Sequence, residues 1–225
     1  MATITFNKAP HSRIAAGAAI VEAAKTIVTK PIKNKLDAFQ KAHREYEAAE
    51  LIVEKADATV HSAEAAVGIL DDAQDEAVND LAAALIGDRY PRVHPFKAFG
   101  VEAPSILVNL GYAVEAKKVK ALAVKVIAKK GLSPKSIAAA KAAQKAAIAV
   151  EQGLVPIAKL KALVAAARSR RDALGQPWET TLAALKRAAR TAEDDGAKGV
   201  YSVLFESTAK PVKKKKVVPP PAPAK

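Results

Sequence analysis

The side chains best suited to chemistry include two histidines in one long helical pattern. His43 and His61 are 18 residues apart, about five helical turns, so they share a face but lie about 27 Å from each other. They are too far apart to bind one metal ion. His61 also forms a D-x-x-x-H-x-x-E pattern with Asp57 and Glu64, which needs ligands from a second helix to hold a metal. We therefore expect surface ion pairs there.

No other pattern in the sequence predicts catalysis. The acidic run 71–76 could attract cations, but it lacks the glycine turn and the spacing of a calcium-binding loop, so we expect a solvated helix face. Phosphate-binding loops and nucleophile elbows are absent. The chain has no cysteine, which excludes thiolate metal sites and thiol nucleophiles. We expect no enzyme activity, no catalytic residue, no metal site and no cofactor.

Aromatic and arginine side chains gather in the segment 87–104. This segment holds three prolines and two glycines, which predicts a long loop. Aromatic and arginine residues in a loop are typical of contact sites. Alternatively, the rings close the open end of a helical bundle. The candidate partner-contact residues are Tyr90, Arg92, Phe96 and Phe99.

Two basic clusters could bind a polyanion. Arg168, Arg170 and Arg171 could grip phosphate, although an acidic helix is a competing partner. The C-terminal tail has six lysines, five prolines and no acid from Lys210 onward, which predicts an extended or disordered segment that binds nucleic acid or another polyanion. A solubilising appendage is the alternative. The candidate tail residues are Lys210, Lys213, Lys214, Lys215, Lys216 and Lys225.

A heptad pattern indicates the element that positions these groups. Large residues alternate with alanine along the uninterrupted helical pattern 32–86, which predicts a seam packed closely against a partner helix in a left-handed supercoil. The large seam positions are Ile32, Phe39, Tyr46, Val53, Val60, Val67, Gln74 and Leu81. The second row is Ala42, Ala49, Ala56, Ala63, Leu70, Ala77 and Ala84.

Charge separates along the chain and indicates the partner of this helix. Residues 32–86 hold twelve acidic and five basic groups, a net charge of −7. Residues 105–175 hold fourteen basic and three acidic groups, a net charge of +11. We therefore expect an antiparallel hairpin, turned by the 87–104 loop, in which the acidic helix packs on basic segments.

Composition supports an all-α fold. The 225 residues are 50% hydrophobic but only 4% aromatic, and a core of small side chains favours closely packed helices. We expect an extended segment and short helix over 1–31, an Ala-seamed helical hairpin or coiled-coil bundle over 32–206, and the tail over 207–225. Shorter helices are expected at 105–130, 133–152, 156–174 and 177–195, and a short strand or a final turn at 199–206.

The sequence indicates neither a membrane span nor a signal peptide. The apolar stretch 14–28 is shorter than the roughly 20 residues of a span. The Lys-rich helix 105–130 could lie on an anionic membrane, but in a bundle it would turn its lysines outward, which we prefer. We expect a cytoplasmic protein, or one inside a particle assembled within the cell.

Two functions fit these patterns. The first is a non-catalytic structural protein, a building block of a larger assembly such as a scaffold or virion-like particle, with subunits as partners and a tail that docks on a polyanion or a neighbouring subunit. It would form a homo-oligomer. The alternative is a sequence-nonspecific nucleic-acid-binding protein of nucleoid-associated type.

Overall fold

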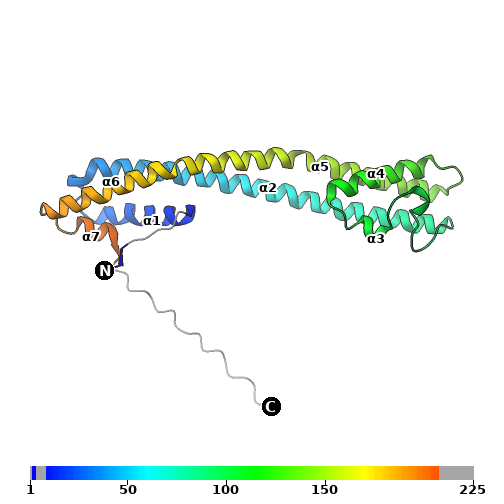
Figure 1. The fold of residues 1–225 in the computed structure, drawn as a ribbon, viewed down its shortest axis with the longest axis horizontal. Coiled ribbons are helices and arrows are strands. Elements are labelled where there is room, and N and C mark those ends of the chain that lie inside the picture. Colours follow the sequence, from blue (N-terminus) through cyan, green and yellow to red (C-terminus); the bar gives the residue numbers. More distant parts are fainter. Residues whose placement is uncertain (1, 4–8, 208–225) are drawn as a thin grey trace, which may run out of the picture. The chain divides into compact units, whose positions relative to one another are not determined.

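The chain folds almost entirely into helices (Figure 1). The structure is a computed structural model that describes residues 2–3 and 9–207. Within those residues it confirms the all-α prediction, with one antiparallel pair of two-residue strands, β1 (Ala2–Thr3) and β2 (Glu206–Ser207). The α-helices are α1 (Pro10–Ala23), α2 (Lys33–Gly87), α3 (Pro104–Leu107), α4 (Tyr112–Ala128), α5 (Pro134–Ala173), α6 (Gly175–Asp194) and α7 (Val200–Phe205). Short 3-10 turns cover Ala24–Thr26, Lys30–Ile32 and Lys97–Phe99.

The predicted boundaries hold best for the long helix. α2 begins and ends one residue later than the predicted 32–86. The predicted helix 105–130 is broken, because the chain leaves α3 after Leu107 and Gly111 takes an extended conformation before α4. The segment 199–206, predicted as a short strand or a final turn, contains the six-residue helix α7.

The predicted break before Pro156 is wrong. α5 is one continuous helix of 40 residues with Pro156 inside it. A proline there removes one backbone hydrogen bond and crowds the preceding turn, usually at a cost of about 3 kcal/mol. Gln152 and Pro156 are both exposed, so water can reach the carbonyl group that loses its partner. The start of α5 is capped as expected, since the Ser136 N–H donates to Ser133 Oγ over 3.2 Å.

The chain divides into two compact units. Unit 1 comprises Met1–Glu50 with Arg170–Lys225, and unit 2 comprises Leu51–Ser169. α2 and α5 each contribute residues to both units. Each unit has a hydrophobic core of its own.

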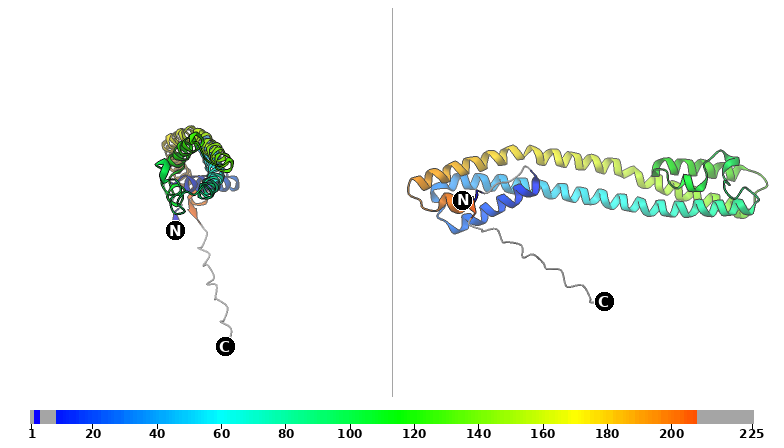
Figure 2. Two further views of the ribbon diagram at one scale, coloured as in Figure 1. Left: turned by 90° about the vertical axis from the view of Figure 1, so that its right-hand side faces the viewer. Right: turned by 60° about the horizontal axis from the view of Figure 1, so that its bottom comes forward.

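In unit 2, α2 and α5 lie side by side and run antiparallel (Figures 1 and 2). The ion pairs set the direction: Asp57 pairs with Arg168, and Glu64 pairs with Lys161. A Cβ atom on Gly153 would lie 3.0 to 3.1 Å from the side chains of Leu70 and Val67. Glycine at this position therefore lets α5 approach α2 closely.

The loop after α2 does not turn the chain directly into its antiparallel partner. It leads into α4, whose first residue, Tyr112, places its hydroxyl group near Gly68 of α2. The reversal into α5 occurs after α4, where the Ser133 N–H donates to Asp88 at 2.9 Å. The predicted reversal at 87–104 is thus corrected: the loop leads the chain back to Gly68 of α2, and α4 intervenes before α5. Residues of the loop, α4 and α5 share the core of unit 2.

The heptad pattern identifies the buried face of α2. The large seam residues are all buried: Ile32, Phe39, Tyr46, Val53, Val60, Val67, Gln74 and Leu81. The second row is buried or partly buried: Ala42, Ala49, Ala56, Ala63, Leu70, Ala77 and Ala84. Small side chains at every second seam position allow the backbones to approach closely.

Unit 1 packs α1, α6 and α7 against residues 33–50 of α2. Its centre is Trp178, which is fully buried and meets the ring of Phe39 edge-on at 5.5 Å. Leu185 and Ala189 follow Trp178 at helical spacing and are buried with it. This face of α6 therefore packs into the core of unit 1.

Candidate interaction surfaces

One side of the α2–α5 pair in unit 2 is bridged by ion pairs. Both carboxylate oxygens of Asp57 accept hydrogen bonds from Arg168 Nη2, at 3.0 and 2.9 Å. Lys161 Nζ lies 2.8 Å from Glu64, and this ammonium group lowers the pKa of the Glu64 carboxyl. His61 Nδ1 lies 3.9 Å from the same carboxylate. The D-x-x-x-H-x-x-E pattern therefore forms surface ion pairs here.

The predicted phosphate grip is largely occupied by acids. In unit 1, Arg171 lies 2.9 Å from Glu50 and 2.7 Å from Asp172. In unit 2, Arg168 pairs with Asp57. Arg170 is exposed. A phosphate would have to displace carboxylates from two of the three arginines, so the acidic helix is the competing partner that the charge pattern anticipates.

The opposite side of the pair is apolar and uncovered. In a heptad-packed pair, each helix has one row of residues on either side of its seam positions. The ion pairs occupy the rows on one side only. On the other row, Ile52 is 49% exposed and Leu163 is 54% exposed. Their row neighbours Thr59, Ala66 and Pro156 are exposed and carry no charge. We call these five residues the bare strip.

The loop residues have divided roles. Phe96 and Phe99 are buried in the core of unit 2, and Tyr90 stacks on Phe99 with ring centroids 5.5 Å apart. The burial of Phe96 and Phe99 matches the alternative that these rings close the end of the bundle. Arg92 is exposed, and its contact with a partner stays a prediction.

Comparison with known proteins identifies no relative. No protein-family model, no curated protein and no solved structure matches this chain. Within the described part of the chain, no helix combines the length and the apolar composition of a bilayer span. The tail lysines Lys210, Lys213, Lys214, Lys215, Lys216 and Lys225 lie outside the described residues.

Unit 1 contains a buried ion pair that the sequence patterns did not reveal. Arg13 of α1 is buried and pairs with Glu179 of α6. Its guanidinium group also lies 5.6 Å from the centroid of the Tyr46 ring. A Cβ atom on Gly175 would come within 2.7 Å of Arg13 Nη1. The pair fixes α1 against α6, and its only sequence signal is a glycine in the first turn of α6.

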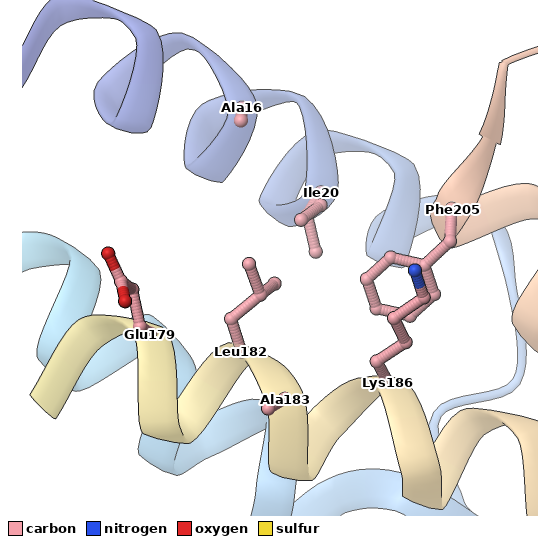
Figure 3. Close-up of a pocket in the computed structure, with 7 residues that line it drawn as sticks. All are labelled: Ala16, Ile20, Glu179, Leu182, Ala183, Lys186 and Phe205. Carbon is pink, nitrogen blue, oxygen red and sulfur yellow. The ribbon is translucent and has the colours of Figure 1, made fainter. Parts of the chain in front are cut away.

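Beside this ion pair is a small pocket of about 240 Å³. Figure 3 shows Ile20, Leu182 and Phe205 around it, with Glu179 and Lys186 towards opposite ends. Glu179 is engaged by Arg13, and Lys186 Nζ lies 5.9 Å from the centroid of the Phe205 ring. The volume is below the roughly 300 Å³ at which ligand pockets begin. The lining is mostly apolar, and both of its charged side chains are engaged by other groups.

His43 makes the stability of unit 1 sensitive to pH. The ring is buried, its Nδ1 accepts a hydrogen bond from Trp178 Nε1 at 3.4 Å, and burial lowers its pKa below 6.5. A proton on Nδ1 would turn this acceptor into a donor that faces another donor. Because the unfolded chain binds this proton more readily, the stabilising contribution of neutral His43 is present above about pH 6.5 and is lost as pH falls towards the folded-state pKa.

We expect His43→Gln to flatten the dependence of the free energy of unfolding on pH below about 6.5. Urea unfolding at a series of pH values measures this dependence. The matched control is His61→Gln, since His61 is exposed on the same helix. Equal pH dependence in the two variants would contradict the assignment to His43.

Proposed function

We propose that this protein is a non-catalytic, helical building block of a larger assembly. In this proposal α2 and α5 form an antiparallel coiled coil with an Ala-rich seam. The Lys-rich tail docks on a polyanion or on a neighbouring subunit. The protein acts within the cell, or in a particle that is assembled there.

The observation that carries the proposal is the contrast between the two sides of the α2–α5 pair. One side is bridged by the Asp57–Arg168 and Glu64–Lys161 ion pairs. The bare strip on the other side leaves about half of Ile52 and Leu163 exposed. In an isolated helix pair no further helix covers such a strip, whereas in a four-helix bundle the other two helices bury it. This favours a second copy of the same pair as the occupant.

Charge also favours a second copy. α2 is acidic and α5 is basic, so two pairs can lie with unlike helices adjacent. Such pairing selects the partner and its orientation more than it adds stability, because exposed ion pairs contribute only about 0 to 1 kcal/mol each. The apolar strip then supplies most of the favourable free energy of association.

The test is the mass of the purified full chain in solution. We expect a discrete homo-oligomer by light scattering, and we expect Leu163→Glu to dissociate it while the helical circular dichroism stays unchanged. Ala158→Glu is the matched control, because Ala158 is exposed on α5 but lies outside the bare strip. A wild-type chain that stays monomeric at all concentrations would overturn the proposal.

Sequence-nonspecific nucleic-acid binding is the second candidate function. It is favoured by the six lysines from Lys210 onward, which can displace counterions from a phosphate backbone. The engagement of Arg168 and Arg171 by acids favours the tail as the site of this activity. A monomer whose mobility shifts with DNA would favour it over assembly.

A further inference from the structure

A cluster of acidic side chains lies between α2 and α4 in unit 2. Asp71, Asp75 and Glu115 each offer a carboxylate oxygen, and these oxygens lie within 4.8 Å of one another. Oxygen ligands bound to one calcium ion at 2.3 to 2.6 Å are separated by at most about 5 Å. The spacing therefore matches a shared cation.

The cluster is buried at its centre and lacks partners. Glu115 is fully buried, and neither of its carboxylate oxygens has a hydrogen-bond partner among the described residues. One oxygen each of Asp71 and Asp75 is buried and unpaired as well. A buried polar group without a partner costs about 1 to 3 kcal/mol, and more if it is charged. Several such groups at one place call for a ligand.

Gln74 provides an independent observation. It occupies a seam position of α2, is fully buried, and neither atom of its amide has a hydrogen-bond partner among the described residues. The amide lies beside Glu115, where it lowers the pKa of that carboxyl against the larger effect of burial. An apolar residue would be the expected occupant of this position. Gln74 instead places a polar amide, with one oxygen that could serve a cation, beside the buried carboxyl of Glu115.

The electrostatics of the cluster also lack a balancing charge. Burial, followed by the contact with Asp75, raises the pKa of Glu115 to about 8. Burial and the charges of Asp75 and Asp72 raise the pKa of Asp71. Two lysines of α4 are engaged elsewhere, because Lys118 pairs with Glu102 and Lys120 pairs with Glu151.

We propose that Asp71, Asp75 and Glu115 bind one hard divalent cation, such as Mg²⁺, Mn²⁺ or Ca²⁺, with the amide of Gln74 beside them. A set of oxygen donors without nitrogen or sulfur selects this class of ion. The cation joins Asp71 and Asp75 of α2 to the first turn of α4. It thereby stabilises the packing of α4 on α2 in unit 2. The proposal is independent of the proposed function.

The experiment is a titration of the chelator-treated full chain with Mn²⁺, followed by electron paramagnetic resonance. We expect one bound Mn²⁺ per chain, competition by Mg²⁺ or Ca²⁺, and a rise in the melting temperature as the site fills. Glu115→Gln and Asp75→Asn should each abolish the binding and the rise. Gln74→Leu should weaken Mn²⁺ binding while it leaves the three carboxylates in place.

Asp72→Asn is the matched control, because Asp72 is exposed beside the cluster and is not among its ligands. It should bind Mn²⁺ as the wild type does. Equal binding by Glu115→Gln and the wild type would overturn the proposal. So would a wild type that binds no Mn²⁺ and whose melting temperature responds only to pH, since the carboxyl groups would then share protons instead of a metal ion. If Glu115→Gln fails to fold, Asp75→Asn decides the outcome.

Discussion

Replacing Trp178 by alanine is expected to lower the free energy of unfolding by about 3 to 5 kcal/mol, the range for truncation of a large buried aromatic residue. Trp178 is fully buried between Phe39 and Tyr46, and its indole N–H donates to His43. The change therefore opens a cavity and removes the hydrogen-bond donor that faces a buried imidazole. Urea unfolding followed by circular dichroism measures the loss.

Tyr112→Ala is the matched control for this prediction. Tyr112 is an aromatic residue at the start of α4 in unit 2, and its side chain is substantially exposed. Its truncation should cost much less, because little packed volume is removed. Similar losses in the two variants would show that Trp178 does not organise the core of unit 1.

Deleting residues 208–225 should remove most binding to duplex DNA and leave thermal unfolding nearly unchanged. Six lysines can neutralise up to about six phosphates, which gives a slope of about −5 in log affinity against log salt. The full chain should therefore lose about a thousandfold in affinity between about 50 and 200 mM salt. Fluorescence polarisation of labelled duplexes at several salt concentrations measures both quantities.

Two comparisons make this prediction specific. A chain with Lys213, Lys214, Lys215 and Lys216 replaced by glutamine keeps its length and should lose about two thirds of the slope, since each cation contributes about equally. Binding should not depend on base sequence, because the tail has no arginine to read guanine and no aromatic ring to stack. Unchanged affinity after truncation would move the interaction to the folded part, with the exposed Arg170 among the candidate residues.

The sequence predicts the long helix well and its surroundings less well. The heptad pattern identifies the buried face of α2 because a helix in contact with one partner repeats its apolar positions every seven residues. The continuity of α5 through Pro156 is not predictable in this way, because local preference disfavours proline there while packing on α2 favours a single helix. The break at Gly111 is missed because apolar residues, among them Leu107, Leu110 and Val114, continue on both sides of it.

The acidic cluster shows why sites are harder to predict than helices. Asp71 and Asp75 lie on adjacent turns of one helix. Glu115 is 40 residues from Asp75 in the sequence and reaches it only when α4 packs on α2. Two signals were present. Gln74 is the one polar residue among the large seam positions, and Glu115 is the one acid in α4. Either indicates a polar site inside an otherwise apolar interface.

The location of Trp178 gives the chain a built-in optical reporter. It is the single tryptophan of the sequence and lies in the core of unit 1. Its emission therefore follows the melting of unit 1, whereas circular dichroism follows the helices of both units. α2 and α5 continue from one unit into the other. A denaturation curve recorded with both signals therefore measures whether unfolding of one unit spreads along these helices to the other. Coincident curves mean that the two cores melt as one cooperative body, and separated curves give each core its own midpoint.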